Sequence, residues 1–213
     1  YVASHHVDHL TNPLVAQVGL MYVLSHRVHD VGYFRPFVND EWDPRLQLMR
    51  EVFGLRDTPE SMYGVTMDEA ADLLGRDLED KLLERIVAKY LYYRRGHEFV
   101  VVGGCDARHL PNDWPANMDT KVAGALNLPM VWATNVAASP MPGESDASLL
   151  DRIVKTAASL RPRGDFKHVP LAGVMLTDIP EAKVESLRSH ARAALAKENI
   201  ALVAAVPSHK KLQ

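Results

Sequence analysis

Short apolar runs alternate with longer amphipathic segments along the whole chain, and this alternation is the main structural signal. The runs predict six β-strands, at residues 1–4, 30–36, 98–103, 129–134, 171–176 and 200–206. The segments between them repeat their apolar residues at helical spacing. Residues 99–102 are continuously apolar, which is typical of a parallel strand covered on both faces. We therefore expect an α/β fold with a mostly parallel sheet of about five to seven strands and helices on both faces.

Several element ends are marked by their own residues. Thr66 and Glu69 have the spacing of a capping box, which predicts a helix beginning at this point. Gly54 follows an amphipathic segment and suits a helix C-cap. Pro36 is expected to end the second strand, and a loop is expected over 38–44.

Length and composition limit the possible classes of protein. The chain has 213 residues, 47% of them hydrophobic and 24% charged, which suits one globular domain over residues 1–213. A net charge of -3, with no basic run longer than two lysines, gives no argument for nucleic-acid binding. Apolar runs stay short of the roughly 18 residues of a membrane span. One cysteine, Cys105, excludes an internal disulfide framework.

The chain starts without methionine, inside an expected strand, so we expect that a segment upstream was removed or left out. A targeting peptide, a tag boundary and a larger parent protein each account for this start. We expect a soluble protein of the cytoplasm, or of an organelle matrix or stroma after loss of a targeting peptide.

The first 26 residues predict a strand, a loop and a helix, the order in which nucleotide-binding folds place their phosphate loop. Such a loop needs glycines, a lysine and a Ser or Thr. Thr11, Asn12 and Pro13 stand in the places of Gly, Lys and Ser/Thr, and His6 stands at the first glycine. An alternative interpretation makes Asn12 a helix N-cap and Pro13 the first helical residue.

Ordered motifs over nearly the whole chain resemble the N-terminal domain of long-form phosphate acetyltransferases. They begin at residues 1–4, 31–36, 49–55 and 62–70, and continue at 99–104, 118–123, 172–176 and 203–207. That family domain is similar to dethiobiotin synthetase, a P-loop NTPase-like fold. The resemblance implies an accessory domain, with acetyl transfer between coenzyme A and phosphate assigned to a separate catalytic domain that this chain lacks.

The chain departs from this family at three positions that would touch phosphate, metal and base. The family loop Ser-Gly-Lys-Ser is replaced by residues 10–13, Leu-Thr-Asn-Pro; its strand-end acid falls on Gly103; and an expected Asn falls on Thr177. Each lost charge-assisted contact forfeits roughly 1.5–3 kcal/mol. Two losses weaken nucleotide binding by about two to four decades. We therefore expect a degenerate nucleotide site without cofactor or catalytic residue.

Other polar residues near the expected strand ends leave alternatives open. His5, His6, Asp8 and His9 suit a metal by ligand type, but they lie on an expected loop without fixed spacing, so no metal site is assigned. A weak anion site at His5 and His6 is an equal alternative. Cys105 is expected to be buried or inert. The candidate ligand residues are therefore His5, His6 and Asp106.

Three functional hypotheses follow. The first is a non-catalytic accessory, regulatory or assembly domain, a pseudoenzyme that acts as a subunit or scaffold in a larger complex or homo-oligomer. The second is an ATP-dependent enzyme with an unusual phosphate loop, and the third is a small-ligand or nucleotide sensor. Trp114 and Met141, on expected loops at 107–117 and 137–147, are candidate anchors for a protein partner.

Overall fold

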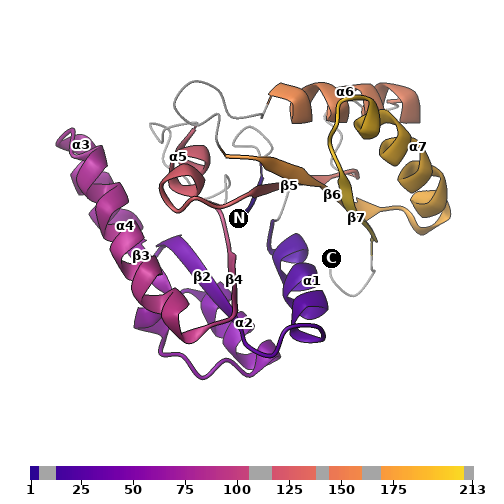
Figure 1. Ribbon diagram of the computed structural model, residues 1–213. Helices are drawn as coiled ribbons and strands as arrows, with labels where there is room; N and C mark the ends of the chain where they lie inside the picture. Colours follow the sequence, from indigo (N-terminus) through magenta and orange to yellow (C-terminus); the bar gives the residue numbers. More distant parts are fainter. Residues whose placement is uncertain (5–12, 106–116, 138–143, 160–168, 209–213) are drawn as a thin grey trace.

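A computed structural model describes residues 1–4, 13–105, 117–137, 144–159 and 169–208, and within them the strands and helices alternate (Figure 1). The strands are β1 Val2–Ser4, β2 Val31–Val38, β3 Tyr63–Thr66, β4 Phe99–Val102, β5 Met130–Asn135, β6 Leu171–Ile179 and β7 Leu202–Pro207. The α-helices are α1 Pro13–Ser25, α2 Pro44–Phe53, α3 Met67–Gly75, α4 Glu79–Tyr93, α5 Met118–Ala125, α6 Asp146–Ser159 and α7 Val184–Lys197. Short 3₁₀ helices are η1 Pro59–Ser61, η2 Arg94–Gly96 and η5 Glu181–Lys183.

The strands form two ladders that meet near the middle of the molecule. One ladder has the order β3-β2-β4 and the other the order β1-β5-β6-β7, and every paired neighbour is parallel. A parallel bridge between Val2 and Gly103 joins them, and the Gly104 amide donates to the Val2 carbonyl at 2.8 Å. The predicted parallel α/β architecture is therefore confirmed.

The strand order determines which helices lie on which face. Crossovers between parallel strands are right-handed, so connections that run in opposite directions along the sheet place their helices on opposite faces. The connections through α1 and α2 run towards β3, whereas those through α4, α5, α6 and α7 run towards β7. The sheet is consequently covered by helices on both faces.

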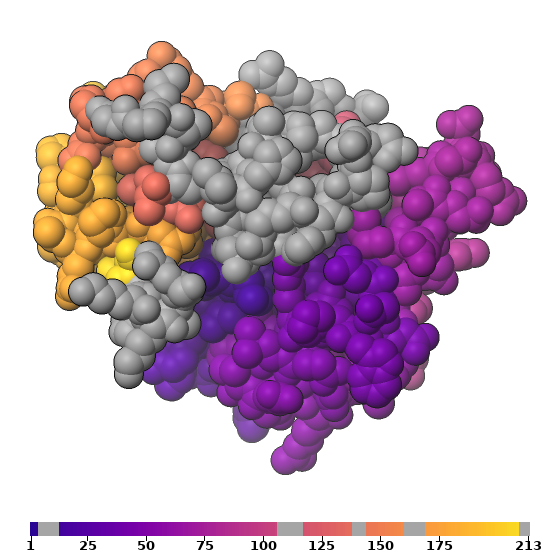
Figure 2. All heavy atoms as spheres, turned by 180° about the vertical axis from the view of Figure 1, so that it is seen from behind, coloured from indigo at the N-terminus to yellow at the C-terminus, as the bar shows by residue number. Residues whose placement is uncertain are grey.

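Buried side chains form two clusters that divide the molecule. The larger cluster joins α1 to α5 with β2, β3 and β4, and the smaller one joins α6 and α7 with β5, β6 and β7. Alternation along β6 separates them, because Met175 belongs to the first cluster and its neighbours Val174 and Leu176 belong to the second. Figure 2 shows the molecule from behind, with indigo to magenta residues mainly on one side of the surface and orange to yellow residues on the other.

All six expected strands are present, but two details of the β2 region differ from the expectation. Pro36 lies inside β2, which continues to Val38. The Arg35 amide donates to Met62 on the β3 side, so the Pro36 nitrogen faces the β4 side, where pairing ends at Phe34. The missing N–H of Pro36 therefore removes no hydrogen bond between β2 and a neighbouring strand. The sequence also gave no signal for β3, a strand of four residues that contains Gly64.

The helix ends follow the predicted side-chain chemistry. The Thr66 hydroxyl accepts from the Glu69 amide, and the Glu69 carboxylate accepts from the Thr66 amide, which completes the capping box of α3. Gly54 caps α2 in the left-handed conformation, with φ of 63°. In the described part of the chain, no helix combines the length and apolar character needed to cross a membrane.

Candidate functional site

Polar side chains gather where β1, β2 and β4 end, at the carboxyl edge at which open parallel sheets bind their ligands. Arg35 comes from β2, Asp43 precedes α2, and Asp119 lies in the first turn of α5. Gln17 on α1 and Tyr33 on β2 complete the group. We call these five residues the edge cluster.

Arg35 and Asp43 form a buried ion pair. Arg35 NH1 lies 2.6 Å from Asp43 Oδ2, and their side chains are only 7% and 4% exposed. The other carboxylate oxygen, Oδ1, accepts from the Arg45 amide at 2.9 Å. Asp43 thus caps α2 and neutralises Arg35 at the same time. Removing one partner of such a pair costs about 3–5 kcal/mol, because the other charge stays buried.

Asp119 is a partly buried residue whose carboxyl group accepts hydrogen bonds from Tyr1 and Cys105. Its Oδ1 accepts from the Tyr1 hydroxyl at 2.5 Å and from the Cys105 amide at 2.9 Å. Desolvation of the carboxyl group raises the pKa of Asp119 above its ordinary value of 3.8, and these hydrogen bonds, a side-chain hydrogen bond with Cys105 and the Arg35 charge oppose the rise. A carboxyl group whose pKa is raised in this way can hold or release a proton closer to neutral pH.

The Tyr33 and Gln17 side chains fill the space next to the end of β4. The Tyr33 hydroxyl donates to Gln17 Oε1 at 2.6 Å, and Gln17 Nε2 donates to the Val2 carbonyl at 3.3 Å. Burial raises the pKa of Tyr33 to about 12, so its hydroxyl stays protonated as a donor. A Cβ atom added at Gly103 would lie 2.5 Å from Tyr33 Oη and 2.9 Å from Gln17 Oε1. The strand-end position therefore has no room for a carboxylate.

Pro13 and Thr177, the other altered positions of the expected nucleotide site that the structure describes, also serve the packing of the fold. Pro13 is buried and is the first residue of α1, as the structural interpretation predicted. Thr177 is 1% exposed, and its hydroxyl donates to the Thr134 carbonyl at 3.3 Å. Cys105 is buried, as expected.

Most of the candidate ligand residues proposed from sequence lie outside the described residues. These are His5, His6, Asp8, His9, Thr11, Asn12 and Asp106. The partner anchors Trp114 and Met141 lie outside as well. Their roles therefore stay predictions. Among the residues that the structure does describe, no group of three or more His, Cys, Asp or Glu is placed to hold a metal.

Sequence reasoning missed the edge cluster itself, although one signal was available. Arg35 interrupts an otherwise uncharged strand, and arginine is rarely buried without a partner. That position predicts a paired charge nearby. Asp43 and Asp119 give no comparable signal, because each lies in a polar stretch. Asp43 becomes buried, and Asp119 partly buried, only when α2 and α5 pack against the strands.

The fold and the edge cluster define a class: a parallel α/β domain compatible with a P-loop-like Rossmann-type fold. No family model matches the chain. A phosphate acetyltransferase of Synechocystis sp. is 26% identical over 122 residues, which cover 55% of this chain and 18% of the relative. A phosphate acetyltransferase of Nitratidesulfovibrio vulgaris is also 26% identical over 122 residues, covering 55% of this chain and 17% of the relative.

The chain is thus similar to a domain of these proteins and spans less than a fifth of their length.

Proposed function

We propose that this chain is a non-catalytic accessory domain, related to a domain of phosphate acetyltransferases, that acts by contact in a larger assembly. The observation that carries the proposal is the packing at Gly103. The Tyr33–Gln17 hydrogen bond occupies the space that a strand-end carboxylate needs. Magnesium-nucleotide chemistry depends on such a carboxylate and on a phosphate lysine, because its catalysis is mainly positioning and charge stabilisation.

Pro13 and Thr177 support the same proposal from the other two altered positions. Pro13 has no N–H for a phosphate oxygen, and its buried ring begins α1. The Thr177 hydroxyl is directed to a backbone carbonyl in the neighbouring strand. Each position serves the packing of the fold, as expected of a domain that retains its scaffold without nucleotide chemistry.

A small-ligand sensor is the second candidate, and the edge cluster favours it. Arg35 and Asp43 form a buried ion pair at the carboxyl edge, and the Arg35 charge also lowers the pKa of the partly buried Asp119. Buried ionisable groups concentrate at functional sites, although structural ion pairs also occur. An ATP-dependent enzyme has less support, since Gly103 and Pro13 both replace groups that such chemistry needs.

Assays of nucleotide binding and acetyl transfer test the proposal that the domain is non-catalytic. Calorimetry of the purified chain with Mg²⁺–ATP is expected to show no micromolar binding. We also expect no acetyl phosphate formation from acetyl-CoA and phosphate above a no-protein control. Micromolar nucleotide affinity, or acetyl phosphate formation in proportion to protein, would contradict the proposal.

Association tests the contact part. Cross-linking in cells, followed by capture of the chain and mass measurement, is expected to give a stable complex. The double variant Trp114→Ala/Met141→Ala is expected to weaken that complex. Trp42→Ala is the matched control, because Trp42 is 78% exposed in the loop before α2. A lone monomer under all conditions, or equal loss in the double variant and the control, would refute this part.

A further inference from the structure

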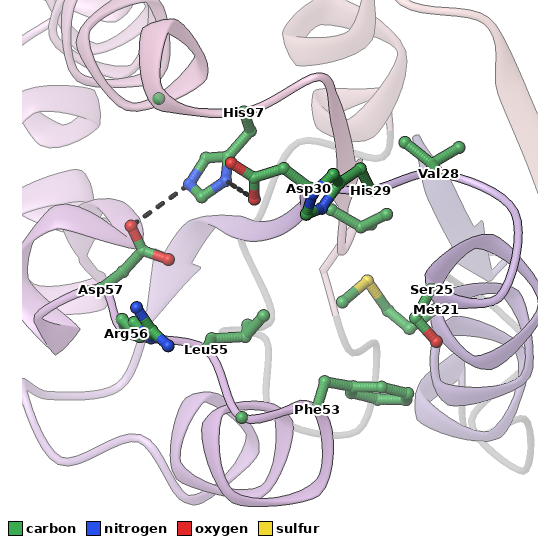
Figure 3. A pocket seen from close by; sticks show the side chains of 13 residues that line it. Met21, Ser25, Val28, His29, Asp30, Phe53, Leu55, Arg56, Asp57 and His97 are labelled. Atoms are coloured by element: carbon green, nitrogen blue, oxygen red, sulfur yellow. Dashed lines mark hydrogen bonds and ion pairs between the residues drawn. The ribbon is translucent and has the colours of Figure 1, made fainter.

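A concave site lies at the edge of the sheet opposite the edge cluster, where β2 and β4 begin (Figure 3). Its volume is about 610 Å³, within the range of roughly 300–1,000 Å³ for small-molecule sites. Four segments surround it: the end of α1, the turn before β2, the chain after α2, and η2. We call it the amino-edge cavity.

One part of the amino-edge cavity is apolar. Met21 from α1, Val28 from the following turn, and Phe53 and Leu55 from the end of α2 line it. Met21 is fully buried, and the other three are partly buried in the larger hydrophobic cluster. This lining offers a dry surface for a hydrocarbon group of limited size.

The facing part is polar and is organised by His97. His97 Nδ1 lies 2.9 Å from Asp30 Oδ1, and Nε2 lies 3.2 Å from Asp57 Oδ1 (Figure 3). Tyr93 supports this arrangement, because its hydroxyl donates to Asp57 Oδ2 at 3.3 Å and accepts from the Tyr33 amide at 3.1 Å. The His97 side chain is only 8% exposed. Both carboxylates are therefore held in fixed positions on either side of one imidazole ring.

Two charged groups at this polar part keep free bonding capacity. Asp57 uses both of its oxygens, whereas Asp30 uses only Oδ1 among the described residues and has a side chain 56% exposed. Arg56 also lines the cavity and is exposed, and it forms no ion pair with the described part of the chain. The cavity thus presents one carboxylate oxygen and one guanidinium beside an apolar wall.

We propose that the amino-edge cavity binds a small zwitterion with an apolar side chain, which is the chemistry of an apolar α-amino acid. The ligand ammonium donates to Asp30 Oδ2, and the ligand carboxylate accepts from the Arg56 guanidinium. Its side chain packs against Met21, Phe53 and Leu55. Both charge-assisted contacts are needed, because an unpaired charge is costly to remove from water.

This inference is independent of the proposed accessory role, since the cavity and the edge cluster lie at opposite edges of the sheet. It adds a ligand that the assembly role does not require. Val31 lines the cavity, and Arg35 of the edge cluster lies four residues further along the same strand. Nucleotide or acetyl-transfer assays do not report on this cavity, so each idea can fail without the other.

Matched ligands give the first test, by calorimetry on the full chain. L-phenylalanine carries both charges, phenethylamine carries only the ammonium, and 3-phenylpropionate carries only the carboxylate. We expect L-phenylalanine to bind, with each single-ended analogue at least about tenfold weaker, which is the effect of losing one charge-assisted contact.

Two variants test which residue contacts the ammonium and which contacts the carboxylate of the ligand. Asp30→Asn keeps an oxygen for His97 and removes the charge, so it is expected to weaken L-phenylalanine about tenfold and leave 3-phenylpropionate unchanged. Arg56→Gln is expected to weaken L-phenylalanine by a similar factor and leave phenethylamine unchanged. Arg95→Gln, at an exposed arginine of η2 outside the cavity lining, is the control and is expected to change neither affinity.

Three outcomes overturn the inference. The first is that none of the three ligands binds at millimolar concentration. The second is that one single-ended analogue binds as tightly as L-phenylalanine. The third is that Arg56→Gln and Arg95→Gln have equal effects. Arg56 is exposed, so its variant keeps the test decisive even where Asp30→Asn affects folding.

Discussion

At the scale of single residues, burial is the largest influence on the ionisation of Asp119 in the edge cluster. Tyr1 and Cys105 donate to one of its oxygens, and Arg35 adds a favourable charge. Burial nevertheless dominates and raises the pKa of Asp119. The folded protein therefore binds this proton more tightly than the unfolded chain does.

Replacing Asp119 with asparagine is expected to change how stability depends on pH. With a raised folded pKa, the Asp119 contribution is fully present below the unfolded pKa and is lost as pH rises through the folded pKa. The free energy of unfolding of the wild type should therefore fall relative to that of Asp119→Asn as the pH rises from about 4 through the folded pKa. Each unit of raised pKa corresponds to about 1.4 kcal/mol. Urea unfolding across this range measures the difference.

Asp80→Asn is the matched control for this prediction. Asp80 is also the second residue of its helix, α4, but it is exposed. The free energy of unfolding of Asp80→Asn is expected to change with pH in the same way as that of the wild type. If the free energies of unfolding of the wild type and Asp119→Asn differ by the same amount at every pH, Asp119 takes up no extra proton on folding.

Residues of the site were predictable from sequence only where the cause is local. Pro13 as the first helical residue follows from its own fixed φ and missing N–H. The crowding at Gly103 was not predictable, because it comes from Tyr33 and Gln17, which reach it only through packing of α1 against the strands. The sequence indicated a changed strand end at Gly103 and left unknown what fills it.

At the scale of elements, α3 depends on its capping box. Thr66→Ala removes the hydroxyl that accepts from the Glu69 amide at 3.2 Å. We expect a loss of about 1 kcal/mol in the free energy of unfolding. Thr58→Ala is the control, because Thr58 precedes η1 without a side-chain capping bond. Denaturant unfolding that gave equal losses for the two variants would contradict the assigned role of Thr66.

Elements with strong periodicity were predicted well, and the exceptions have physical causes. β3 was missed because four residues that include a glycine carry little alternation; Gly64 is needed there since an added Cβ would lie 2.6 Å from the Pro36 carbonyl. The end of β2 was placed too early because the effect of Pro36 depends on which side its neighbour strand occupies. The pattern of hydrophobic and polar residues along the sequence contains neither the close approach at Gly64 nor the side on which a neighbouring strand lies.

At the scale of the whole molecule, the two hydrophobic clusters predict two regions of separable stability. Ile86 on α4 and Ile153 on α6 are both 1% exposed and belong to different clusters. Replacing either with alanine is expected to cost about 2–5 kcal/mol. Hydrogen exchange should show Ile153→Ala lowering amide protection mainly in β6 and α7, and Ile86→Ala mainly in β2 and β4. Equal loss of protection throughout, in both variants, would mean a single cooperative unit.

The arrangement of the whole sheet was only partly predictable. Alternation of strands and helices predicted the parallel sheet and a ligand edge at the strand ends, and the edge cluster lies at that edge. It did not predict the strand order or the amino-edge cavity. Three segments distant in sequence build that cavity, at residues 21–31, 53–57 and 96–97, and His97 links the first two through Asp30 and Asp57.

The central position of β1 has a consequence for how the chain reaches this fold. Val2 pairs with Val131 and bridges to Gly103, so β1 finds these sheet neighbours only after β4 and β5 have been synthesised. Pairings between residues so far apart in sequence slow folding, because the loop entropy is lost before the contacts form. During translation at about 5–20 residues per second, β1 stays without its sheet partners for several seconds.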